Sequence, residues 1–120
     1  MKRVYLREIA HARAGDKGDT SNIGVIAYQP QYFPVLLAQV TPDRVRAHFR
    51  GLAKGPITRY ELPQLWAINL VLERSLGGGV TRSLSLDPHG KSYSTLILTM
   101  AVEVDDAIAA ELIEAGRQPL

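Results

Sequence analysis

One short stretch, residues 11–24, holds most of the side chains that could do chemistry. It combines three glycines, two carboxylates, one ammonium group and several hydroxyl and amide groups in the order HARAGDKGDTSNIG. So polar a segment belongs on the surface. Asp16, Lys17, Gly18 and Asp19 are typical of a tight turn, with Lys17 and Gly18 at its centre, Gly18 supplying a positive φ and the aspartates accepting main-chain hydrogen bonds.

Three interpretations of this loop remain open. Main-chain amides near Gly15, Gly18 and Asp19, together with Lys17 and Arg13, suit an anion such as phosphate or a CoA-type ligand. The two aspartates oppose an anion and would instead suit a hard cation such as Mg²⁺. In the third interpretation the aspartates bond only the turn's own amides. The spacings of a P-loop and of a dinucleotide-binding fingerprint are both absent.

A second group of polar residues lies further along the chain. Arg59 and Glu61 share one face of a predicted strand, where they either pair at the surface or orient the loop. Asn69 falls in an apolar run and needs a hydrogen-bonding role. Gly78 is the centre of a glycine triplet that suggests close approach of a backbone, ligand or subunit. The candidate ligand-binding residues are therefore Arg13, Gly15, Asp16, Lys17, Gly18, Asp19, Thr20, Ser21, Asn22, Arg59, Asn69 and Gly78.

No residue is assigned a catalytic role. His11, at the mouth of the loop, is either a general base or a surface histidine without a role. The three histidines lack zinc-site spacing, and the chain has no cysteine. No hydroxyl lies in a nucleophile-elbow context. We assign no metal site and no cofactor.

Composition predicts one soluble domain spanning residues 1–120, in a reducing cytoplasm. Hydrophobic residues make up 46% of the chain and charged residues 22%, which excludes disordered and fibrous classes. No signal peptide or membrane span is recognisable. The net charge of +2 and the lack of interleaved aromatics argue against nucleic-acid binding. The first sixty residues carry about +6 and the remainder about −4, which either attract each other or build an anion-binding face.

Hydrophobic periodicity and helix caps predict the elements. Alternation predicts strands over 3–14, bent at Glu8, and over 23–28, 57–62, 80–86 and 92–104, with a turn at 87–90. A helix that begins at Thr20 or Ser21 competes with the second strand. Helices are predicted with Pro34 in the first turn, with Pro42 at the first helical position after a cap at Thr41, over 64–76, and from a cap at Asp105 through 115. This order indicates an α+β sandwich of the ferredoxin-like kind, mainly antiparallel, with helices on one face and the other face free to meet a partner.

Two motifs add a family resemblance. The blocks RAGDKGDTSNIGVIAY and RYELPQLWAINLVLERSLGGGVTRSLSLDPHGK are similar to the small C-terminal domain of acyclic terpene utilisation (AtuA-type) proteins, from about His11 to Met100. The resemblance implies a ferredoxin-like fold and an association with catabolism of acyclic terpenoids and branched acyl-CoA thioesters. It implies no reaction.

The resemblance leaves two functions in competition. Longer family members have a large N-terminal domain before this one, whereas only ten residues precede His11 here. Either a separately encoded large subunit completes the assembly, with this chain as its accessory subunit, or the chain acts alone. Acting alone, it would bind or convert a small anionic or CoA-type ligand at residues 11–24, as a monomer or a homo-oligomer.

Overall fold

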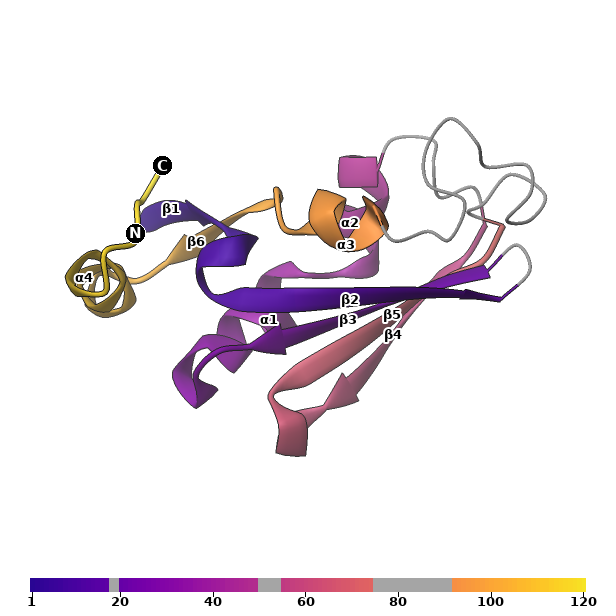
Figure 1. Cartoon of the computed structure of the whole chain (residues 1–120), viewed down its shortest axis with the longest axis horizontal. Helices are drawn as coiled ribbons and strands as arrows, with labels where there is room; N and C mark the ends of the chain where they lie inside the picture. Colours follow the sequence, from indigo (N-terminus) through magenta and orange to yellow (C-terminus); the bar gives the residue numbers. More distant parts are fainter. Residues whose placement is uncertain (18–19, 50–54, 75–91) are drawn as a thin grey trace.

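The computed structural model describes residues 1–17, 20–49, 55–74 and 92–120, coloured in Figure 1. The strands are β1 (Lys2–Tyr5), β2 (Ala10–Lys17), β3 (Thr20–Ala27), β4 (Ile57–Leu62), β5 (Ala67–Leu72) and β6 (Ala101–Val104). The α-helices are α1 (Phe33–Gln39), α2 (Pro42–Phe49), α3 (Ser92–Ile97) and α4 (Asp106–Glu114). Three short 3-10 helices are η1 (Leu6–Glu8), η2 (Pro30–Tyr32) and η3 (Pro63–Leu65).

The described strands form two antiparallel sheets. Four strands pair in the order β2-β3-β5-β4, and β1 pairs with β6 in a separate two-stranded ribbon. Because β3 and β4 both run antiparallel to β5, they are parallel to each other with β5 between them. The chain joins β3 to β4 through α1 and α2, which makes a split β-α-β unit.

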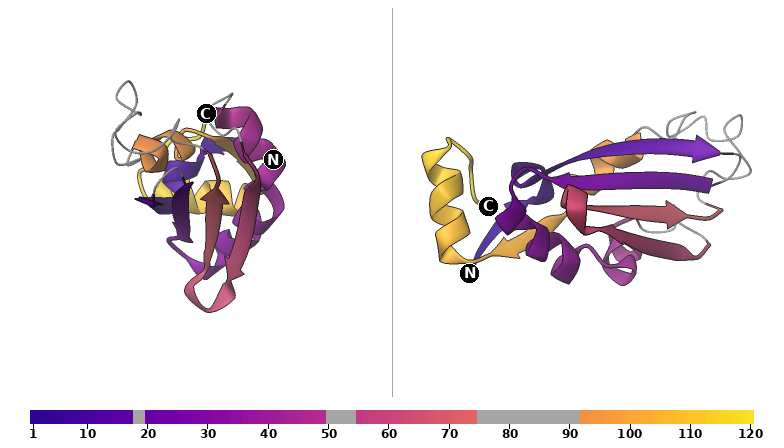
Figure 2. Two further views of the ribbon diagram at one scale, coloured as in Figure 1. Left: turned by 90° about the vertical axis from the view of Figure 1, so that its right-hand side faces the viewer. Right: turned by 90° about the horizontal axis from the view of Figure 1, so that it is seen from below.

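Helices cover one face of the larger sheet. Helix α1 packs on β3 and β5, α3 packs on β2 and β3, and α2 packs against β4 and α3. Seen from the opposite side, the four strands lie side by side with no α-helix in front of them (Figure 2, right). Ile23, Val25, Ile68 and Leu70 alternate along the two central strands and are fully buried against the helices. The predicted α+β, ferredoxin-like arrangement is confirmed.

Several predicted elements are confirmed together with their end signals. Helix α1 carries Pro34 in its first turn, and α2 begins at Pro42 directly after Thr41. The Asp105 side chain accepts a hydrogen bond from the Ile108 amide at 2.8 Å and thereby caps α4. Strand β4 has the predicted bounds. Local cap chemistry therefore predicted these elements well.

The predicted first strand is interrupted. Instead of one strand over 3–14, β1 and β2 are separated by η1, and the bend predicted at Glu8 lies at this break. Main-chain bonds from the Leu6 amide to Met100 O and from the Arg7 amide to Leu98 O hold η1 against the segment after α3. The alternative of a helix beginning at Thr20 or Ser21 is wrong, because β3 begins there.

The predicted helix over 64–76 is wrong. Pro63 starts only a 3-10 turn, which ends at Trp66 with φ 53°, and strand β5 follows. The apolar run predicts a helix because it fills more than one helical stripe. A central strand gives a similar apolar run, since β5 lies between β3 and β4, buries one face against the helices and keeps Asn69 and Val71 half-buried on the other.

The strand predicted over 92–104 is also wrong in its first half. Residues 92–97 form α3, in which Tyr93 and Ile97 are spaced one helical turn apart and are fully buried. Only Ala101–Val104 is a strand, and its Val102 and Val104 are buried as predicted. The strand predicted over 80–86 and the turn at 87–90 lie outside the described residues.

Candidate functional site

The uncovered side of the four-stranded sheet, called the open face below, brings together residues from all four strands. Strand pairing aligns Arg13 with Gly24, Gly24 with Asn69 and Asn69 with Tyr60. Since side chains alternate along a strand, and Ile23 and Leu70 face the helices, this row faces the other way. Arg13 and Asn69, far apart in the sequence, therefore flank one glycine.

Gly24 leaves a depression in the middle of this row. A Cβ built at this position would meet nothing within 4 Å, so the surface above the backbone is empty. The flanking residues on neighbouring strands stand about 5 Å away on either side. Arg13 is exposed and makes no hydrogen bond or ion pair within the described part of the chain. Arg13 and Asn69 thus flank the open space above Gly24, and Tyr60 lies one strand beyond Asn69.

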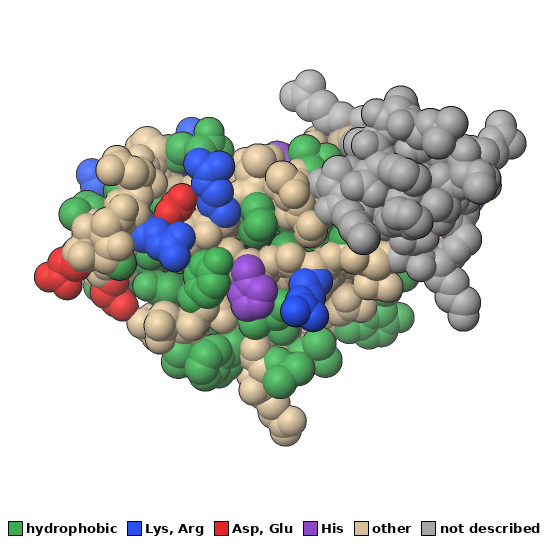
Figure 3. All heavy atoms as spheres, in the orientation of Figure 1, with side chains coloured by type: hydrophobic (Ala, Val, Ile, Leu, Met, Phe, Trp, Pro, Cys, Tyr) green, Lys and Arg blue, Asp and Glu red, His purple; other side chains and the backbone are tan. Residues whose placement is uncertain are grey.

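Large hydrophobic side chains are exposed on the open face and at one end of it. Tyr60 is 55% exposed and Trp66 is 40% exposed. The other exposed members of this group are Tyr28, Leu62 and Leu65. Figure 3 shows hydrophobic side chains gathered along the lower side of the molecule, beside one histidine and a basic side chain. We call Tyr28, Tyr60, Leu62, Leu65 and Trp66 the apolar patch.

His11 lies at the edge of this patch within a stack of rings. Its imidazole lies 5.3 Å from the Tyr28 ring, and the Arg117 guanidinium lies 5.4 Å from that same ring. Arg117 also approaches the Glu8 carboxylate at 3.5 Å. Nearby, burial raises the pKa of Tyr32, with the Glu111 charge adding to the increase and Arg117 opposing it. These contacts fix His11 as part of a surface stack.

The predicted loop is largely a β-ladder. Strand β2 extends to Lys17 and β3 starts at Thr20, so Gly15 pairs with Asn22 and Asp16 pairs with Ser21. The prediction that residues 15–22 form a loop between two strands is wrong. Strand β3 pairs with β5 as far as Ser21 and Asn22, so the sheet continues into this polar stretch. The side chains of Asp16 and Lys17, like residues Gly18, Asp19 and Gly78, lie outside the described residues.

The predicted site residues separate onto two sides of the sheet. Asn22 is exposed with Arg13 on the open face, and its carboxamide lies over Gly15, where an added Cβ would stand 3.4 Å from Oδ1. Ser21 faces the helices, is fully buried, and donates from Oγ to the Gly15 carbonyl at 3.2 Å. Thr20 is half-buried at the start of β3. Arg13, Asn22 and Asn69 therefore come together, whereas Ser21 does not join them.

Arg59 lies on the helix side and has a different set of partners. Its Nη1 donates to the carbonyls of Leu37 at 2.8 Å and Val40 at 3.1 Å. Its Nη2 pairs with Glu61 at 3.1 Å, so the predicted surface pair exists. The helix α1 carbonyls, which sequence reasoning did not anticipate, are its main partners. Arg59 ties the end of α1 to β4.

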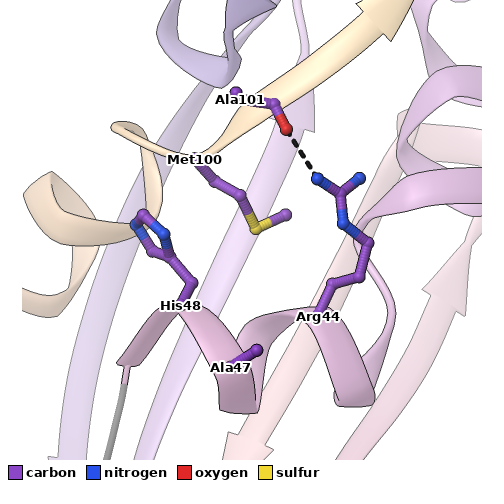
Figure 4. A pocket seen from close by; sticks show the side chains of 5 residues that line it. All are labelled: Arg44, Ala47, His48, Met100 and Ala101. Atoms are coloured by element: carbon purple, nitrogen blue, oxygen red, sulfur yellow. Dashed lines mark hydrogen bonds between the residues drawn. The ribbon is translucent and has the colours of Figure 1, made fainter.

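A cavity of about 300 Å³ between α2 and β6 is the competing location (Figure 4). Arg44 and His48, one helical turn apart on α2, line it beside Met100 and Ala101. The Arg44 guanidinium donates to the Ala101 carbonyl at 2.8 Å, and His48 Nε2 lies 2.9 Å from the Leu96 carbonyl. Arg44 therefore satisfies a main-chain carbonyl at the start of β6, and the His48 ring lies within hydrogen-bonding distance of a carbonyl in α3. Sequence reasoning passed over this pair, although its i, i+4 spacing signals a shared helix face.

The open face is consequently the better candidate site. In the described part of the chain, no three His, Asp or Glu side chains gather closely enough to hold a metal ion. No helix among the described residues is long and apolar enough to cross a membrane.

The fold and the open face define a class: a ferredoxin-like α+β domain with one covered and one uncovered sheet face. The sequence comparison then specifies the family. The chain belongs to the AtuA ferredoxin-like domain family, whose sequence model matches residues 4–103. No curated protein and no solved structure matches the chain. The resemblance drawn from the two sequence motifs is therefore confirmed at the level of the family.

Proposed function

We propose that this protein is an accessory subunit that docks through its open face onto a larger, separately encoded AtuA-type protein. The observation that carries the proposal is the apolar patch on and beside the uncovered face of the sheet. Contiguous exposed hydrophobic side chains mark interaction surfaces, and tyrosine and tryptophan are enriched at interface centres. Membership of a family defined by a domain supports a partner that supplies the rest of the assembly.

The assembly we propose works in the cytoplasm, in catabolism of acyclic terpenoids and branched acyl-CoA thioesters. The resemblance of the two sequence motifs implies this pathway, and the cysteine-free sequence is compatible with a reducing compartment. The accessory chain contributes a surface, and we assign it no reaction of its own.

Co-purification with the large AtuA-type protein tests the docking. The two chains should co-elute in size-exclusion chromatography. Tyr60→Asp should abolish co-elution, because it places a charge within the apolar patch. Ile113→Asp is the matched control, since Ile113 is 57% exposed but lies on α4, away from the sheet. Separate elution of the two wild-type chains would contradict the proposal.

Anion binding is the second candidate function, and the row Arg13, Gly24 and Asn69 specifically favours it. Two donor side chains border an empty surface there, and Arg13 makes no ion pair with the described residues. Thermal-shift measurements with acyl-CoAs, with inorganic phosphate and with Mg²⁺ test it. An anion should raise the melting temperature of the wild type and should not do so in Arg13→Ala. No shift with any of these probes would eliminate this candidate.

A further inference from the structure

Two described residues other than glycine have positive φ, and they flank strand β5. Trp66 precedes the strand with φ 53°, and Arg74 follows it with φ 52°. In this left-handed region the Cβ crowds the backbone, so glycine and asparagine are the usual occupants and a bulky residue is an outlier. Backbone strain of this kind is a reason to look for a function.

The core does not explain why a tryptophan stands at this position. Its side chain is 40% exposed, next to Leu65, which is 63% exposed. Main-chain bonds hold its backbone: the Trp66 amide donates to the Pro63 carbonyl at 3.1 Å, and the Trp66 carbonyl accepts from Ala27 at 2.9 Å. Any residue makes these bonds. These main-chain bonds therefore do not require the indole ring, part of which remains exposed.

An apolar hollow adjoins this tryptophan. Residues 61–65 line a cavity of about 370 Å³ at the tip of the β4–β5 hairpin. The exposed ring and the hollow lie together at one end of the open face. A protruding aromatic side chain beside a hollow is typical of the centre of a protein interface.

We propose that Trp66 is the anchor that inserts into an apolar pocket of the large AtuA-type protein. This inference rests on the proposed function. It also requires that carboxylates surround the pocket. Tryptophan is among the residues that most often carry the binding energy of an interface. The carboxylates of the partner would face Arg13 and His11 across the open face.

The distribution of charge favours such a partner over a second copy of this chain. Arg13 is a charged residue that the strand register places on the open face, and its side chain is exposed. The described acids of the C-terminal segment lie instead on β6 and α4, as Glu103, Asp106, Glu111 and Glu114. A two-fold contact through the open face would place two copies of this basic face against each other and bring like charges together. An acidic surface on a different protein complements it.

Trp66→Gly tests the anchor, because it removes the ring and the backbone strain together. Titration calorimetry with the large protein should show a dissociation constant raised at least about thirtyfold, the effect typical of an interface hot spot. The melting temperature should be unchanged or higher, since glycine accepts this φ. Trp66→Asn, which also tolerates the left-handed region, repeats the test with a side chain present.

Arg74→Gly is the matched control, since it relieves the same conformation at the opposite end of β5. It should leave the dissociation constant unchanged. Arg13→Glu should weaken binding at least tenfold at low salt and by less at high salt, as expected for a charge facing carboxylates.

The outcomes separate the anchor from the docking itself. If the wild type binds the large protein and both Trp66 variants bind equally well, the anchor is refuted and the proposed function stands. If the wild type does not bind, both are refuted. A wild-type homodimer that Trp66→Gly dissociates would identify a second copy as the occupant and would overturn the proposal. Binding that is indifferent to Arg13→Glu would refute the acidic partner surface.

Discussion

The basic side chains on the two sides of the four-stranded sheet differ in their hydrogen-bond partners. On the helix side, Arg59, Arg44 and His48 contact main-chain carbonyls at the ends of α1, α3 and neighbouring segments. On the open face, Arg13 has no such partner among the described residues. The arginines on the helix side therefore hold parts of the fold together, whereas under our proposal Arg13 on the open face faces the partner protein.

Among these substitutions, we expect the largest change in stability at Arg59. Arg59→Met keeps the aliphatic stem but leaves the carbonyls of Leu37 and Val40 without their donor. The free energy of unfolding should fall by about 1–3 kcal/mol. Urea denaturation measures it.

Arg13→Met is the matched substitution on the open face. Because no described group depends on Arg13, its unfolding free energy should stay within about 0.5 kcal/mol of wild type. Equal losses for the two variants would remove the distinction between the two sides.

A smaller effect is expected at Gly24, on the same face. Gly24→Ala adds a methyl group into empty space, and alanine loses less conformational entropy than glycine on folding. Stability should therefore rise by about 0.5 kcal/mol, as measured by thermal denaturation. The added methyl group should also reduce any anion-induced shift in melting temperature. A loss of stability would mean that the surface above Gly24 is covered.

The smallest effect concerns Tyr32 and is absent at neutral pH. Burial raises its pKa above the ordinary value of 10.0, so the folded state favours the neutral phenol. Below pH 10 the Tyr32 phenol is neutral in both the folded and the unfolded state. As the pH rises past it, the unfolded state ionises first and stability falls until the pH passes the folded-state pKa.

Tyr32→Phe cannot ionise and should lose less stability than wild type between pH 8 and about pH 11. Melting temperatures of both proteins across this interval measure the difference. Identical losses would show that Tyr32 does not contribute to the alkaline destabilisation.

The sequence predicts an element well where the signal lies within that element, and poorly where the element depends on contacts with distant strands. The caps at Thr41 and Asp105 are local signals, and they placed the starts of α2 and α4 correctly. The identity of β5 depends instead on its two neighbouring strands, which an apolar run does not reveal. Tyr93 and Ile97 fit one helical face, but they stand beside alternating residues that favoured a strand.

The candidate site was predictable in its residues and not in its arrangement. Arg13, Asn22 and Asn69 were identified as polar residues in need of a role. Their gathering around Gly24 follows from the pairing register of β2, β3 and β5, which is a long-range property. The same register places Ser21 on the helix side of the sheet, where it is buried. The strain at Trp66 has no sequence signature, because it arises where η3 meets β5.

Hydroxyl-radical footprinting of the complex with the large AtuA-type protein tests the central claim most directly, since it reports the exposure of individual side chains. Tyr60, Leu65 and Trp66 are exposed in the free chain, as is Ile113 on α4. Complex formation should strongly lower the oxidation of the first three and leave that of Ile113 unchanged. Protection of Ile113 with continued oxidation of Tyr60 and Trp66 would show that the open face is not the docking surface.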